Sequence, residues 1–190
     1  MNEPESAISD APARLAGLLS SQVRAGVLVR AVTHPEEPFS LTEMARTLGL
    51  AISSVQHECY KLHDMGLLTV RREGASRRYS LMVDDPVVRA LRGLVVATLG
   101  MPASVEMALS DLPGLNAATL LGAVPPVSGA TALVLIGDLT LETVELGQRR
   151  VAWLLDAPED AIEIAFFRPA YWLARRDAGH PLVRRLLDLP

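Results

Sequence analysis

The stretch from Phe39 to Leu81 decides the fold of this chain. It reads FSLTEMARTLGL over residues 39–50, AISSVQHECYKLHDMGLL over 51–68 and TVRREGASRRYSL over 69–81. The pattern predicts a short helix, a tight turn, a second helix and an arginine-rich hairpin. That order is typical of a winged helix-turn-helix, in which one helix is placed in the major groove of DNA.

Local signals mark where the two helices of this stretch begin and end. Ser40 is followed three residues later by Glu43, which is the pattern of a capping box at the start of the first helix. Gly49 permits the turn that follows. Ser53 or Ser54 is expected to cap the second helix.

The second helix has an apolar face and a polar face. Apolar side chains at i, i+4 and i+7 are expected to point inward, namely Val55, Cys59 and Leu62. The opposite face holds side chains that donate or accept hydrogen bonds, namely Ser53, Gln56, His57, Tyr60, Lys61 and Asp64. Such groups can read base edges, so this face is the candidate recognition surface. The alternative is a polar face that is merely solvated.

The hairpin concentrates positive charge in a chain whose net charge is −4. Residues 69–80 hold four arginines against the single acid Glu73, a local charge of +3 (four minus one). Guanidinium groups suit phosphates or a narrow minor groove. The residues predicted to contact DNA are therefore Ser53, Ser54, Gln56, His57 and Lys61 of the helix over 53–65, and Arg71, Arg72, Arg77 and Arg78 of the wing over 69–80.

Residues 13–82 resemble the winged-helix domain of bacterial transcription regulators of the arsenical-resistance-repressor and multiple-antibiotic-resistance type. The matching segments are LTEMARTLGL (41–50), SSVQ (53–56), LHDMGLL (62–68), RREG (71–74) and RRY (77–79). The resemblance implies major-groove contacts from the helix residues named above and places Arg72 and Arg77 in the wing. The position of Cys59 is usually a core leucine in that family, so we interpret Cys59 as packing, with redox sensing as the alternative.

The rest of the chain completes an α+β fold in two domains. Residues 1–12 are acidic, contain two prolines and are expected to form a disordered tail. One helix is predicted from Ala13 to about Thr33, within a winged-helix domain over residues 13–85. Residues 86–190 are expected to hold a linker helix and a small mixed α/β domain.

The second domain is expected to contain three short strands. A helix from Thr140 to about Leu155 precedes the third strand, so parallel pairing across it would make a right-handed crossover. The predicted strands are 117–121, 131–136 and 161–167, and the other predicted helices are 86–100, 102–109, 170–176 and 181–187.

This domain resembles a minimal nucleotidyltransferase that has lost its acidic residues. The matching segments are LLG (120–122), ALVLIGD (132–138), IAFFRP (164–169) and PLVRRLL (181–187). Such enzymes carry a Gly-Ser pair and two aspartates one residue apart, which hold two magnesium ions. Here Gly122 is followed by Ala123, and the aspartate positions fall on Ala130 and Ala132. Glu163 can fill a third acidic position, but one carboxylate cannot organise two ions. No catalytic residue, metal or cofactor is predicted.

Composition bears on disulfides, metal sites and membrane segments. A single cysteine gives no disulfide framework and no cysteine-based zinc site. No apolar run approaches the length of about 18 residues that a membrane span needs. The acidic start lacks the features of a signal peptide, so a cytoplasmic location without a membrane partner is expected.

The sequence thus predicts a DNA-binding transcriptional regulator. A homodimer on double-stranded DNA is expected, with the C-terminal domain serving dimerisation or regulation through a small-molecule or protein effector. Two alternatives stay open: a nucleotidyltransferase targeted by its winged helix, and an antitoxin-like protein-interaction module.

Overall fold

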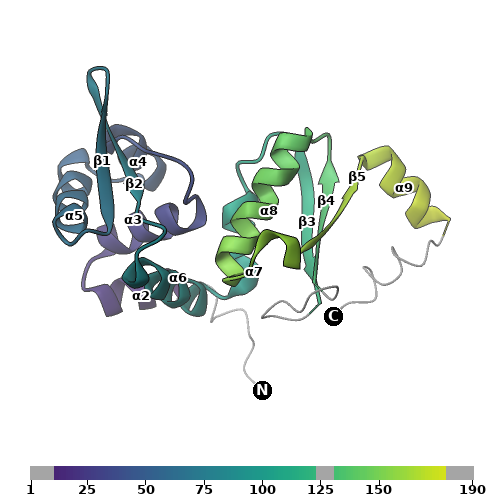
Figure 1. The fold of residues 1–190 in the computed structure, drawn as a ribbon, viewed down its shortest axis with the longest axis horizontal. Coiled ribbons are helices and arrows are strands. Elements are labelled where there is room, and N and C mark those ends of the chain that lie inside the picture. The colour runs from purple at the N-terminus through teal and green to yellow at the C-terminus, as the bar shows by residue number, and fades with distance from the viewer. Residues whose placement is uncertain (1–10, 123–130, 179–190) are drawn as a thin grey trace. The chain divides into compact units, whose positions relative to one another are not determined.

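The chain divides after Ser104 into two compact units, residues 1–104 and 105–190 (Figure 1). The computed structural model describes residues 11–122 and 131–178. Residues 1–10 of the predicted tail, the loop positions Ala123 and Ala130, and the predicted helix 181–187 lie outside the described residues. The helical start at residue 11 shows that the predicted tail extended two residues too far.

The first unit begins with two helices where the sequence predicted one. Helix α2 spans Ala11–Leu19 and α3 spans Gln22–Thr33, and the two are bent by 111°. Ser20 adopts a left-handed φ of 53°, and the Oγ of Ser21 accepts a hydrogen bond from the backbone N–H of Arg24 at 3.1 Å. The single long helix is wrong because this serine pair ends one helix and caps the next.

Helix α4, Leu41–Leu48, begins at the predicted capping box. The backbone N–H of Glu43 donates to the Oγ of Ser40 at 3.2 Å, and the N–H of Ser40 donates to the Glu43 carboxylate at 2.8 Å. Gly49 takes a left-handed φ of 65°, which turns the chain toward the next helix. The first half of the helix-turn-helix is therefore confirmed.

Helix α5, Ile52–Asp64, is the second helix of this motif. Its N-cap is Ala51, whose carbonyl accepts from the N–H groups of Ser54 at 3.1 Å and Val55 at 3.2 Å. Capping by Ser53 or Ser54 is wrong, because both serines already lie inside the first turn. The predicted inner face is confirmed, since three of its side chains are fully buried: Val55, Cys59 and Leu62.

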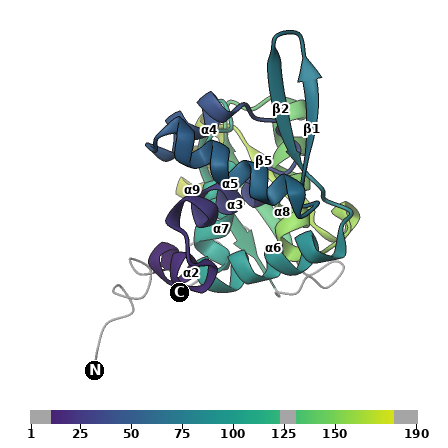
Figure 2. The ribbon, with the colours of Figure 1, turned by 90° about the vertical axis from the view of Figure 1, so that its left-hand side faces the viewer.

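Strands β1, Leu68–Glu73, and β2, Ser76–Leu81, form the predicted antiparallel hairpin. Phe39 adds a backbone bridge to Tyr79, with N···O distances of 2.8 and 2.9 Å, and their rings stack at 5.9 Å between centroids. Gly74 supplies the left-handed residue of the turn, with φ 59°. The hairpin projects beyond α4 and α5 as a wing (Figure 2).

Helix α6, Pro86–Leu99, belongs to the first unit by its contacts. The Asp85 carboxylate caps it, accepting from the N–H groups of Val87 at 2.7 Å and Val88 at 3.2 Å. The helix packs against α2 and α3. The sequence grouped this helix with the second half of the chain as a linker, whereas here it completes the core around α3.

The second unit is built on a three-stranded sheet in the order β3-β4-β5. Strand β4 pairs antiparallel with β3 and parallel with β5, as expected for a crossover through α8. Residues of β4 are buried at its centre, whereas most of β3 is exposed. The bounds are Met101–Leu109 for α7, Leu115–Leu121 for β3, Ala132–Gly137 for β4, Leu141–Leu155 for α8, Glu159–Ala161 for the short helix η1, Glu163–Phe167 for β5 and Pro169–Asp177 for α9.

The buried side chain of Arg150 joins α8 to the end of α7 and to the residues that follow it. The side chain of Arg150 is 1% exposed, and its Nη1 donates to the Ala108 carbonyl at 2.7 Å and the Asp111 carboxylate at 2.5 Å. Gly147 allows the close approach, because a Cβ there would meet Leu112 at 3.2 Å. These contacts fix the position of α8, the helix of the crossover between β4 and β5.

No single helix in the described residues is long and apolar enough to cross a membrane. Two bent pairs of consecutive helices, α2 with α3 and α6 with α7, pass the same test together by length and composition.

We expect Arg150→Met to lower the free energy of unfolding of the second unit by about 1–3 kcal/mol, because the buried Ala108 carbonyl loses its donor. Urea titration followed by tryptophan fluorescence measures this, since both tryptophans, Trp153 and Trp172, lie in this unit. Arg149→Met is the matched control on the exposed side of α8. Equal midpoints for the two variants would contradict the assigned role of Arg150.

Candidate nucleic-acid interface

The exposed face of α5 carries the polar residues that the sequence selected. Four of them are exposed: Ser53, Ser54, His57 and Lys61. Gln56 is half-buried, and its Nε2 donates to the Tyr60 hydroxyl at 2.9 Å. The five predicted helix residues thus lie on one element and remain accessible to a ligand.

The four wing arginines divide between the two faces of the hairpin. In the observed register, Arg72 lies opposite Arg77 and Arg71 lies opposite Arg78. Because side chains alternate along a strand, Arg72 and Arg77 continue the face that holds Tyr79. Arg71 and Arg78 belong to the other face.

The face with Arg72 and Arg77 is turned toward α5. Burial raises the pKa of the Tyr79 hydroxyl, nearby Tyr60 of α5 acts in the same direction, and a hydrogen bond with Arg77 opposes both. Tyr79 is 1% exposed, and strand β1 beside it packs against α5. The face that carries Arg72 and Arg77 therefore continues the side of the hairpin that is buried against the helices of the first unit.

Arg78 has a different role from the other wing arginines. Its guanidinium pairs with the carboxylate of Glu43, and its Nε donates to Glu73 at 3.2 Å. The pKa of Glu43 is lowered chiefly by the backbone N–H of Ser40, and the charge of Arg78 contributes, so this carboxylate stays ionised at neutral pH. The pair holds β2 against the start of α4.

Arg72 and Arg77 have no carboxylate partner among the described residues. Both are exposed, and they face each other directly across the hairpin. Like charges in directly opposed positions destabilise a strand pair. A bound anion between or beside them would relieve this repulsion.

A buried acid on α5 was missed by the sequence analysis. Glu58 is 7% exposed, and its Oε2 lies 2.8 Å from the Nε of Arg24 on α3. Arg24 also donates to the Leu19 carbonyl at 3.2 Å, so one guanidinium joins α2, α3 and α5. The helical period contained this information, because position 58 lies three residues after buried Val55 and four before buried Leu62.

Cys59 is an internal side chain. It is fully buried, and burial raises the pKa of its thiol to about 12, with the negative charge of Glu58 acting in the same direction. A thiol in this state packs as a small apolar group. Within residues 11–122 and 131–178, no three His, Cys, Asp or Glu side chains are grouped so that they could hold a metal ion.

No protein-family model and no curated protein sequence matches this chain. Among solved structures, the transcriptional regulator BldR from Sulfolobus solfataricus is similar, with 21% identity and a TM-score of 0.38. The aligned region covers 57% of this chain and 76% of that chain. A likeness of this size does not by itself assign a function.

We expect the Cys59 thiol to react with the disulfide reagent DTNB only after unfolding. At pH 8 a thiol with a pKa near 12 is ionised in about one molecule in ten thousand, and its burial blocks access as well. Absorbance during reaction in buffer and in concentrated urea measures the difference, which we expect to exceed about a hundredfold. The variant Ser54→Cys, which adds an exposed thiol to the same helix, should react at once with one equivalent. Rapid labelling of the unaltered protein would instead support redox sensing.

Proposed function

We propose that this protein is a DNA-binding transcriptional regulator. In this proposal α5 enters the major groove and the β1–β2 hairpin contacts the phosphate backbone or the minor groove. The observation that supports it is the exposed pair Arg72 and Arg77, held on the side of the hairpin that faces α5. No carboxylate neutralises this pair in the described part of the chain. A duplex phosphate is an anion of the right kind to occupy it.

The two elements have different tasks in this proposal. The wing arginines supply charge that is insensitive to base sequence, and the side chains of α5 supply hydrogen bonds to base edges. Gln56 is the main candidate for reading a base, because an amide can bond adenine at two atoms. Its present partner is the exposed Tyr60 hydroxyl, which a base edge can replace.

We further propose that the protein acts as a homodimer on a two-fold related DNA site, because paired half-sites are how single helix-turn-helix units gain affinity. The second unit is assigned dimerisation or regulation rather than catalysis. Ala132 pairs with Leu121 and Glu163 in the sheet, and its methyl group offers no metal ligand at the place where a nucleotidyltransferase has an aspartate.

We expect Arg72→Ala and Arg77→Ala each to weaken DNA binding on all sequences. Each variant removes about one phosphate contact, so the slope of log K against log salt should decrease by about 1. Fluorescence anisotropy with the full chain and a duplex from upstream of its own coding sequence measures this between about 50 and 200 mM salt. The control is Arg89→Ala, an exposed arginine at the start of α6. Slopes that fall equally in all three variants, or in none, would count against the proposed wing contact.

Gln56→Ala should instead relax base preference. Loss of a bidentate contact removes about 1–3 kcal/mol of discrimination at one position. Selection of bound duplexes from a randomised pool, with each variant, measures this as the loss of one preferred base. Glu106→Ala is the control, an exposed residue of α7 that belongs to neither the helix-turn-helix nor the wing, and it should retain the preference. An unchanged preference in Gln56→Ala would assign base reading to other residues.

A further inference from the structure

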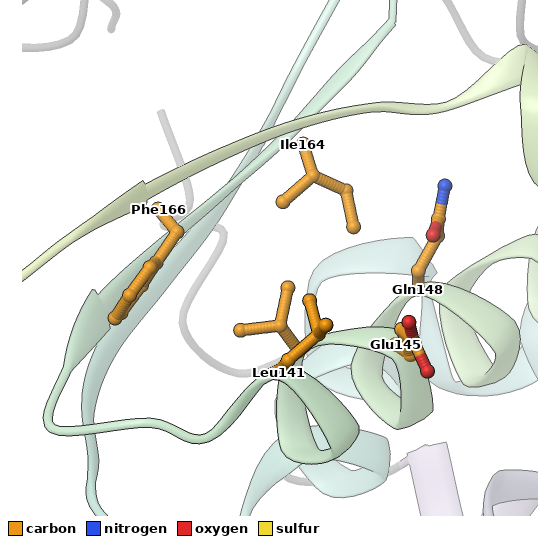
Figure 3. Close-up of a pocket in the computed structure, with 6 residues that line it drawn as sticks. Leu141, Glu145, Gln148, Ile164 and Phe166 are labelled. Atoms are coloured by element: carbon orange, nitrogen blue, oxygen red, sulfur yellow. The ribbon is translucent and has the colours of Figure 1, made fainter.

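The second unit contains an open groove between α8 and β5 (Figure 3). Its volume is about 500 Å³, which lies within the range of sites for small molecules. Six residues line it: Leu141, Val144, Glu145 and Gln148 of α8, and Ile164 and Phe166 of β5. All belong to one unit, so the groove does not depend on how the two units are placed.

One end of the groove is apolar and unusually exposed. Leu141 is 74% exposed and Phe166 is 37% exposed, although both are large hydrophobic residues. In Figure 3, Leu141 and Ile164 face each other across the space, and Phe166 lies at the end away from Gln148. Covering these side chains with an apolar ligand would be favourable by removing their surface from water.

The other end presents hydrogen-bond acceptors. The Nε2 of Gln148 donates to the carbonyls of Glu159 and Ile162, both at 3.0 Å. Two carbonyl partners require the NH₂ group at that position, so the amide oxygen is the atom left for a ligand. Glu145 adds an exposed carboxylate beside it, which is also only an acceptor when ionised.

We infer that this groove binds a lipophilic cation, an amine with an aromatic or alkyl body. The body would lie against Phe166, Leu141 and Ile164, and the ammonium group would donate to Glu145 and to the Gln148 oxygen. This deepens the proposed function by naming the chemical class of its effector. Binding of the amine itself requires only the second unit.

The dipole of α8 opposes the binding of a cation near the start of that helix. A helix N-terminus carries about half a positive charge, which would favour an anion near Leu141. Glu145 carries a full negative charge in the lining of the groove, whereas Glu142, in the first turn of α8, is not among the lining residues. Glu145 is the one charged residue among the six that line the groove, and its negative charge favours a cation as the ligand.

Three probes with one hydrophobic body test the inference: 4-phenylbutylamine, 4-phenylbutanol and 4-phenylbutyrate. Titration of the full ¹⁵N-labelled chain at pH 7, followed by NMR chemical shifts, gives each dissociation constant and locates the site. The amine should bind about three- to tenfold more tightly than the alcohol, since the ion pair is partly exposed to water. The acid should bind most weakly, and shifts should fall on α8 and β5.

Matched variants assign the preference to the groove. Glu145→Gln should make the amine and the alcohol bind alike, whereas Glu142→Gln, the same charge change on the same helix, should preserve the preference. Phe166→Ala should weaken all three probes, with circular dichroism as the check on its folding. Equal effects of the two glutamate variants, tighter binding of the acid, or no binding of any probe would overturn the inference. The inference would also be overturned if a second copy of the chain covers the groove. In that case the chemical shifts of the same residues would change when the protein is diluted.

The two proposals fail in different ways. A chain that binds the amine but no duplex supports the groove and contradicts DNA binding. A chain that binds duplex in the anisotropy measurement but takes no amine supports DNA binding and contradicts the groove.

Discussion

The wing depends on how its base is anchored, because its own charges oppose hairpin formation. Arginines face arginines at two successive positions of the hairpin. The opposing attraction comes from the buried ring of Tyr79, its backbone bridge to Phe39 and the pairing of Arg78 with Glu43. Exposed pairs contribute little to stability, about 0–1 kcal/mol, so burial of Tyr79 is the larger effect. The hairpin is therefore anchored at its base, and its exposed part can carry Arg72 opposite Arg77 despite their mutual repulsion.

Helix α5 is positioned by an interaction of a different kind. Glu58 is buried in the interface between α5 and α3, where an unpaired carboxylate would be costly. Arg24 compensates it and at the same time binds the end of α2 through the Leu19 carbonyl. Ser21, which caps the start of α3, also accepts a hydrogen bond from the backbone N–H of Arg24. Arg24 thus links the bend between α2 and α3 to α5, and Lys61 places a second cation 3.7 Å from the Glu58 carboxylate.

Local signals in the sequence predicted most helices and strands. Features that depend on tertiary packing could not be predicted from those signals. The capping box at Ser40 and the inner face of α5 follow from interactions within four residues, so both were predictable. The cap at Ser53 or Ser54 was wrong because several adjacent residues can begin a helix, and here the helix begins at Ile52, before both serines. The alternation of side chains along a strand places Arg72 and Arg77 on one face of the hairpin and the other two wing arginines on the opposite face. The sequence does not say which of these faces packs against the helices, and only the structure shows it. The groove joins α8 to β5 across a chain separation that no local pattern spans.

Charge distribution bears on how an acidic chain could bind DNA as proposed. The wing has a surplus of three positive charges in a chain of net charge −4, which leaves −7 for the remaining residues. Salt screens exposed charges beyond about 8 Å at physiological ionic strength, so a phosphate against the hairpin responds mainly to the nearest guanidinium groups. The distant acids act before contact, by reducing long-range attraction to any polyanion. Such a protein would gain its selectivity for DNA sites at short range, where the arginine pair and the polar face of α5 act on the same duplex.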